Sequence, residues 1–176
     1  MPARRVFLVV PLVLLAAGCF GGGDGEKSKA VAHVGRAAIM REHLDETVDH
    51  FKEEAQNEGK PFPAEGSARY HAVERQALGL MVYRTELLQS AARLGVPVTD
   101  DEVERRAKAA GGEAEAEKNG SFAEDTIRAQ IAYEHLYRKV TSKVSKVQRG
   151  EAMARFLFKM KRGYKVSYEP GFRPSS

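Results

Sequence analysis

Cysteine and histidine, which often carry nucleophilic or metal chemistry, are sparse and scattered in this sequence. There is one cysteine, Cys19, and there are five histidines. His43 and His50 are seven residues apart, whereas a metal-binding pair on one helix prefers a spacing of about four. No Gly-x-Ser-x-Gly or metal-binding motif occurs in the sequence. We therefore expect no metal, no cofactor and no enzymatic activity.

The residues before Cys19 give that cysteine a different explanation. Residues 1–5 contain two arginines, and residues 6–18 form an apolar run that ends in small residues. This order is typical of a secretory signal, and the run is shorter than the roughly 20 residues that a membrane-spanning helix needs. Residues 15–19 resemble the bacterial lipobox, which implies cleavage immediately before Cys19 and a diacylglycerol on its sulfur. A secreted protein with a free cysteine is the alternative.

The sequence is thus predicted to have three parts. Residues 1–18 are a lipoprotein signal peptide. Residues 19–29 are rich in Gly, Ser and charge, which is typical of a flexible tether. Residues 30–176 are long enough for one folded domain. The lipidated Cys19 would anchor that domain to a cell membrane on the extracytoplasmic side, with the inner and outer membranes both left open.

The charge balance argues against a nucleic-acid partner. The whole chain has 28 basic and 24 acidic residues, a formal net charge of +4. Removal of residues 1–18 takes away two arginines and lowers this to +2. No Lys/Arg block stands out in the rest of the sequence, and an exported protein does not meet nucleic acid in its normal compartment. We expect no nucleic acid among the partners.

Hydrophobic periodicity predicts a mainly α, multi-helix domain with a small two-stranded sheet formed by the first and last strands. The longest helix carries an apolar row along its length, in which Gly79 is a candidate for a close helix crossing. Two capping boxes, at residues 99–102 and 121–124, predict helix starts. The expected strands are 30–34 and 164–168, and the expected helices are 39–58, 67–94, 99–110, 121–140 and 151–162.

Two segments resemble the SurA/PrsA-type chaperone domains. Residues 31–44 match the opening strand, glycine and helix of that family, with Met40 in place of its usual threonine. Residues 91–103 match its leucine-glycine-valine link and capped helix. In SurA and PrsA a parvulin-type prolyl isomerase domain is inserted before the last helix. The corresponding stretch here, 141–150, is too short for a domain, so the resemblance implies the chaperone domain without the isomerase.

The resemblance leads to a hypothesis for function. The domain would bind unfolded or newly exported proteins by extended apolar segments in a groove between helices, with the space between the longest and the last helix as the first place to look. Flexible Met and aromatic side chains suit such promiscuous binding, although periodicity alone cannot separate groove from core. The candidate peptide-binding residues are Met81, Tyr83, Tyr133, Tyr137, Phe156 and Met160.

Two other functions stay open at this point. The same fold could serve an accessory envelope lipoprotein that binds one folded partner, because a fold does not fix a function. A peptidyl-prolyl isomerase is a third, less favoured hypothesis. The sequence leaves the oligomeric state and the identity of any client undecided.

Overall fold

The computed structural model describes residues 29–109 and 113–173, and this part of the chain is mainly helical with one small sheet. The predicted signal peptide, Cys19 and nearly all of the tether lie outside the described residues. The elements in chain order are β1 (Ala30–Val34), β2 (Ala37–Met40), α2 (Arg41–Asn57), α3 (Ala68–Arg93), α4 (Asp100–Ala109), α5 (Glu113–Thr141), a short 3₁₀ helix η1 (Lys146–Gln148), α6 (Arg149–Gly163) and β3 (Val166–Tyr168).

The sheet is antiparallel and has the strand order β2-β1-β3. The predicted pairing of the first and last strands is confirmed, with Val34 opposite Val166. The predicted two-stranded sheet is wrong in one respect, because residues 37–40 form a third strand. Gly35 allows this return: its φ of +60° suits the first position of a two-residue hairpin turn, which other residues rarely adopt.

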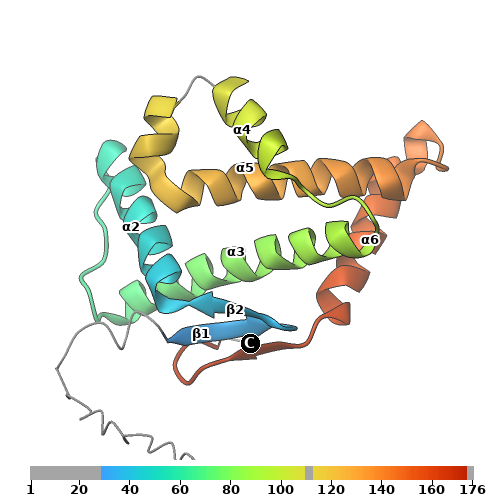
Figure 1. Ribbon diagram of the computed structural model, residues 1–176. Helices are drawn as coiled ribbons and strands as arrows, with labels where there is room; N and C mark the ends of the chain where they lie inside the picture. Colours follow the sequence, from blue (N-terminus) through green and yellow to red (C-terminus); the bar gives the residue numbers. More distant parts are fainter. Residues whose placement is uncertain (1–28, 110–112, 174–176) are drawn as a thin grey trace, which may run out of the picture.

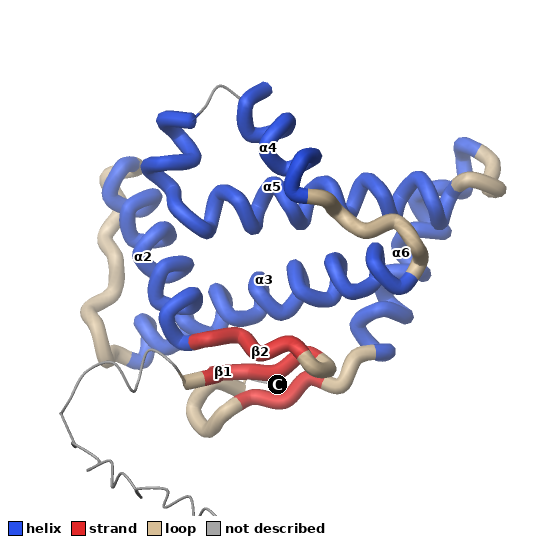
Figure 2. Tube along the Cα trace, in the orientation of Figure 1, coloured by secondary structure: helices blue, strands red, loops and turns tan. Residues whose placement is uncertain are grey.

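Helix α3 is the central element of the fold. Figure 1 shows it running across the molecule, with α2 crossing near one end and α6 near the other. Figure 2 shows the three strands on one side of α3 and α5 on the opposite side. At about 1.5 Å per residue a helix of this length spans about 39 Å, so α3 contributes to both ends of the molecule.

The core is accordingly divided into two clusters along α3. The first contains Leu78 and Val82 of α3 with Val34, Leu44 and other side chains from the sheet and α2. The second contains Leu87 and Ala91 of α3 with residues from α5 and α6, namely Ala132, Leu136, Met153 and Met160. Gln89 links the helix to the sheet, since its Nε2 donates to the Val34 carbonyl oxygen at 2.9 Å.

Local sequence signals account for several of the helix ends. Ser67 caps α3 through its Oγ, which accepts from the Tyr70 backbone N–H at 3.1 Å. The predicted capping box at Thr99 is confirmed: the Thr99 N–H donates to the Glu102 carboxylate at 3.0 Å. The Glu102 N–H donates back to the Thr99 hydroxyl at 3.3 Å. The hydrogen bond from the Thr99 backbone also lowers the pKa of Glu102.

Three predictions about the helices are wrong. Helix α2 begins at Arg41 and not at residue 39, because Ile39 and Met40 belong to β2. Ser121 does not start a helix, since α5 already begins at Glu113; the Ser121 hydroxyl donates to Glu46 of α2 instead. Gly79 does not mark a close crossing, because a Cβ built there would meet nothing within 4 Å.

Candidate functional site

A groove of about 350 Å³ lies between α3 and α5. Helix α3 contributes side chains spaced three and four residues apart, which is the spacing of one helix face. Helix α5 contributes a second row with the same spacing. The residues that line the groove are Leu80, Tyr83, Arg84 and Leu87 from α3, and Thr126, Ala129, Gln130, Tyr133 and Glu134 from α5.

The groove is mostly apolar, with two phenol groups in its walls. Tyr133 is 38% exposed and stacks on Tyr137, with 6.5 Å between the ring centroids. Across the groove, Tyr83 is half-buried, and the ammonium of Lys161 lies 5.8 Å from its ring centroid. Burial raises the pKa of Tyr83, so its hydroxyl stays protonated at neutral pH. Such a site offers apolar contact together with hydroxyl groups that donate and accept hydrogen bonds.

One end of the groove is fixed by Arg84, whose side chain is buried. Its Nη2 donates to the Thr126 hydroxyl at 2.6 Å, and its guanidinium carbon lies 4.5 Å from the ring centroid of Phe122. Burial lowers the pKa of Arg84, yet an arginine keeps its charge in proteins. These contacts tie α3 to α5 beside the groove.

The acid at the groove edge is already paired. Both oxygens of the Glu134 carboxylate accept from the Arg106 guanidinium of α4, at 3.0 and 2.8 Å. This two-point contact lowers the pKa of Glu134 and holds α4 across α5. The lining therefore presents apolar surface and hydroxyls, together with a carboxylate that is already paired.

The family model of the SurA-like N-terminal domain matches residues 3–142, well over half of the chain. The chain belongs to the SurA-like N-terminal domain family. It is also 26% identical over 80 residues to Chaperone SurA of Pseudoalteromonas translucida (strain TAC 125). That match covers 46% of this chain and 17% of the relative, so the chain spans a small part of that protein. The mainly helical fold agrees with the family.

The six candidate residues have different positions in this SurA-like domain. Tyr83 and Tyr133 line the groove together, and Tyr137 stacks behind Tyr133. Phe156 is half-buried and packs against the second core cluster. Met81 is buried in the first core cluster and Met160 in the second. Neither side chain offers surface to a ligand in this structure. This groove lies between α3 and α5; the sequence predicts a groove between helices without fixing which, and gives the space between α3 and α6 as the first place to look.

Sequence analysis missed most of the groove lining. The apolar row of the long helix contains Leu80 and Leu87, and periodicity does not show that this row also lines a groove; Leu87 is in addition a buried core residue. Arg84 is not part of that apolar row. The available signal was the matched spacing of residues 80, 83, 84 and 87 with residues 126, 129, 130 and 133. Exposed apolar side chains were missed as well: Val147 is 96% exposed and Phe158 is 62% exposed.

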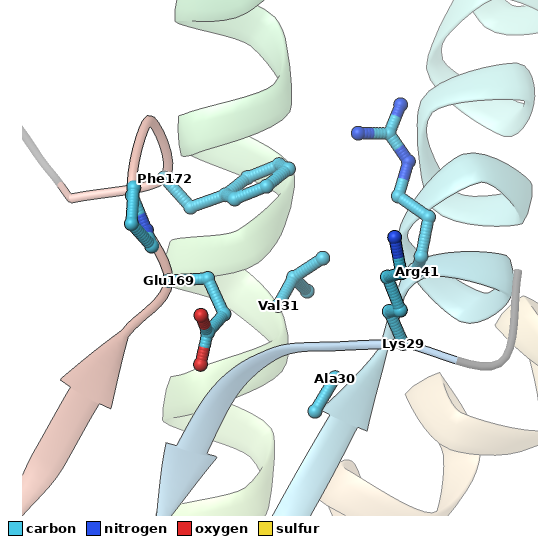
Figure 3. A pocket seen from close by; sticks show the side chains of 7 residues that line it. Lys29, Ala30, Val31, Arg41, Glu169 and Phe172 are labelled. Atoms are coloured by element: carbon cyan, nitrogen blue, oxygen red, sulfur yellow. The ribbon is translucent and has the colours of Figure 1, made fainter. Parts of the chain in front are cut away.

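A second hollow lies where the sheet meets residues 169–172 (Figure 3). It has a volume of about 480 Å³. Lys29 and Arg41 lie on one side, Glu169 and Phe172 on the other, and Val31 lies between them. Its mixed charges make it a poor site for an apolar segment, and Arg41 is occupied by ion pairs with Asp45 and Glu74, at 2.8 and 2.9 Å.

Residues 29–109 and 113–173 contain no group of three or more His, Cys, Asp or Glu side chains that could hold a metal ion. Within the same ranges no helix is long and apolar enough to cross a bilayer. The α3–α5 groove is taken as the candidate functional site because its lining is mostly apolar and includes two of the six candidate residues, Tyr83 and Tyr133.

Proposed function

We propose that this SurA-like domain is a lipid-anchored extracytoplasmic chaperone that binds extended apolar segments of exported proteins in the α3–α5 groove. The observation that carries the proposal is the groove itself. Leu80, Tyr83 and Tyr133 present apolar surface there in a chain that belongs to a chaperone-like family. The lining contains no arrangement specific for one sequence, which suits clients that share only their apolar character.

The size of the groove supports weak and reversible binding. A volume of about 350 Å³ accommodates only a few side chains of a client. Burying each apolar side chain contributes about 1.5–3 kcal/mol before losses, and association itself costs several kcal/mol. Net binding is therefore weak. This is the behaviour required of a chaperone that must release its client for folding.

The proposal is tested by aggregation of an unfolded client in the presence of the full chain. We expect suppression by the wild type and a several-fold loss in the Tyr133→Ser variant, because Tyr133 is an exposed groove side chain whose removal leaves the core intact. Val147→Ser is the matched control, since Val147 is exposed and lies outside the groove lining. Equal suppression by both variants, or none by the wild type in stoichiometric excess, would refute groove binding.

Anchoring is a separate part of the proposal and has its own test. Labelled fatty acid should be incorporated into the wild type and not into a Cys19→Ala variant. Cys19 is the single cysteine of the chain, so the label has one possible thiol. Incorporation into the Cys19→Ala chain would contradict the assignment.

The proposal contains no catalytic step. The groove offers apolar surface and phenol hydroxyls, and Glu134 is paired with Arg106, so we expect no prolyl isomerase activity above the uncatalysed rate. A short proline-containing peptide measured with and without the full chain tests this. Acceleration of isomerisation by the wild type that is lost in Tyr133→Ser would show that the groove is an active site.

A further inference from the structure

Charge is divided unevenly along the chain. Residues 29–137 contain 14 basic and 20 acidic residues, a net charge of −6, whereas residues 138–165 contain 10 basic residues and one acidic residue, a net charge of +9. The second segment comprises the end of α5, η1, α6 and the turn into β3, and Figure 1 places it at the end of α3 opposite to α2. The net charge of the whole sequence does not reveal this separation, and the basic residues of the second segment are spread over many positions.

The outward side of α6 carries part of this charge on one helix face. Arg155, Phe158, Lys159 and Arg162 are all exposed and follow the i, i+3, i+4, i+7 spacing of a single face. The opposite side of α6 is buried in the second core cluster through Met153 and Met160. We call the four exposed residues the α6 face.

The α6 face is short of acidic partners. Among the described residues the one ion pair it makes joins Arg155 to Glu151, at 3.0 Å, and both side chains are largely exposed. Phe158 lies in the middle of the face and is 62% exposed. The guanidinium carbon of Arg162 is 5.4 Å from its ring centroid. An exposed aromatic ring surrounded by basic side chains is typical of helices that lie on anionic membrane surfaces.

We propose that the α6 face docks the domain onto a bilayer that contains anionic phospholipids. The face is a convex helix side and none of its residues lines the hollows described above, so it suits an extended charged plane. Each basic residue near such a plane contributes about 1 kcal/mol, or about fivefold in binding. The acidic remainder of the domain, with α2 at its far end, would be held away from the same surface by repulsion.

The reach of the N-terminal segment is compatible with this docking. Cys19 and Lys29 are ten residues apart, and ten extended residues span at most about 35 Å. The five residues of β1 cover about 17 Å, and at their far end the Gly35 N–H donates to the Lys165 carbonyl oxygen, next to the end of α6. The α6 face is a few helical turns from there. An anchor at Cys19 and the α6 face can therefore occupy one bilayer.

Lysine acetylation of the full chain on vesicles tests the docking directly. On vesicles of phosphatidylcholine with phosphatidylglycerol, acetylation of Lys159 should slow at least several-fold relative to phosphatidylcholine alone. Lys52 of α2 and Lys108 of α4 are exposed internal controls whose rates should not change. Because both controls are in the same molecule, a general effect of vesicle attachment would slow their acetylation together with that of Lys159.

Paired variants separate the α6 face from general charge. Arg155→Gln/Arg162→Gln should weaken docking about 25-fold, at about fivefold for each charge, and so remove the protection of Lys159. Arg36→Gln/Arg105→Gln makes the same charge change at two exposed arginines outside the α6 face. In this variant Lys159 should remain protected. Addition of salt should reduce the protection in the wild type, because exposed charges are screened.

Several results would overturn the docking. Equal protection of Lys159 on neutral vesicles, protection of Lys52 or Lys108 instead, or no protection on either vesicle would each do so. Protection by poly-glutamate without protection by anionic vesicles would assign the α6 face to an acidic protein partner. Client aggregation is measured without vesicles, so failure of the docking leaves groove binding standing, and failure of groove binding leaves the docking standing.

Discussion

The two sides of α3 differ although they belong to one helix. The side that faces the sheet is sealed: Leu78 is fully buried against strands and α2. On the side that faces α5, Leu80 lines a groove and is only half-buried. The opposing residues Thr126 and Ala129 are too short to fill the space between the helices. The lesson is that the sizes of the facing side chains, and not the hydrophobicity of α3, decide where this fold is open.

The largest expected effect is on the sealed side. Leu78→Ala removes a fully buried side chain and should lower the free energy of unfolding by about 3 kcal/mol, within the usual range for such a cavity. Leu80→Ala is the matched control and should lose less than about 1 kcal/mol, because Leu80 is already partly in contact with water. Urea unfolding of the two variants measures the difference. Similar losses would mean that the groove side is packed as tightly as the sheet side.

The sealed side also contains a buried carboxylate. Glu74 accepts from Arg41 Nη2 at 2.9 Å and lies 2.6 Å from His71 Nδ1. Glu74→Ala leaves the guanidinium of Arg41 without its buried partner. We therefore expect the free energy of unfolding, measured by thermal unfolding, to fall by about 2 kcal/mol. His71→Ala, which removes the more exposed partner, should lose clearly less. A Glu74→Ala chain as stable as the wild type would show that the network contributes nothing.

Filling the groove tests the open side without opening a cavity. Ala129→Leu places a larger side chain into the groove lining and should reduce client protection about tenfold, equivalent to about 1.4 kcal/mol of binding. Ala109→Leu on α4 is exposed and serves as the control for added hydrophobicity. Thermal unfolding must show that Ala129→Leu still folds. Undiminished protection by a folded variant would place the client elsewhere.

Glu86 gives a smaller effect with a defined pH dependence. It is buried near Lys161, and burial raises its pKa while Lys161 opposes the rise. The folded state therefore binds this proton more tightly than the unfolded state, and stability falls as pH rises through the raised pKa. Glu86→Gln, which cannot ionise, should be more stable than the wild type by about 1 kcal/mol at neutral pH.

The same variant should lose its advantage in acid. Below the unfolded pKa of Glu86 the wild type is protonated in both states, so the two chains should have the same melting temperature. Thermal unfolding at neutral and acidic pH measures both limits. A Glu86→Gln chain that is less stable at neutral pH would show that the electrostatic attraction of Lys161 outweighs the cost of burying the Glu86 charge.

The sequence predicts the elements better than it predicts the site. Ser67 and the Thr99 capping box fix two helix starts locally, and the alternation in residues 30–34 fixes β1. Residues 37–40 were missed because an apolar run of four residues fits a helix start as well as a strand, and only pairing with β1 decides. Ser121 satisfied a capping pattern inside α5, since a pattern that favours a helix start does not require one.

The groove could not be located from periodicity. Leu78 and Leu80 are both apolar and both belong to α3, and their different burial depends on what packs opposite them. The same holds for the candidate residues: Met160 is buried and Tyr133 is exposed, although each lies on an apolar helix face. Contacts between distant segments decide such cases, and a single sequence does not contain them.

Gly79 lies between Leu78 and Leu80 and gives the smallest and sharpest test of the comparison. It belongs to neither side of α3, and a Cβ there would meet nothing within 4 Å. Gly79→Ala should therefore raise the free energy of unfolding by about 0.5–1 kcal/mol through helix propensity alone. Client protection should stay unchanged. Destabilisation would mean that another part of the chain packs closely against α3 at this position.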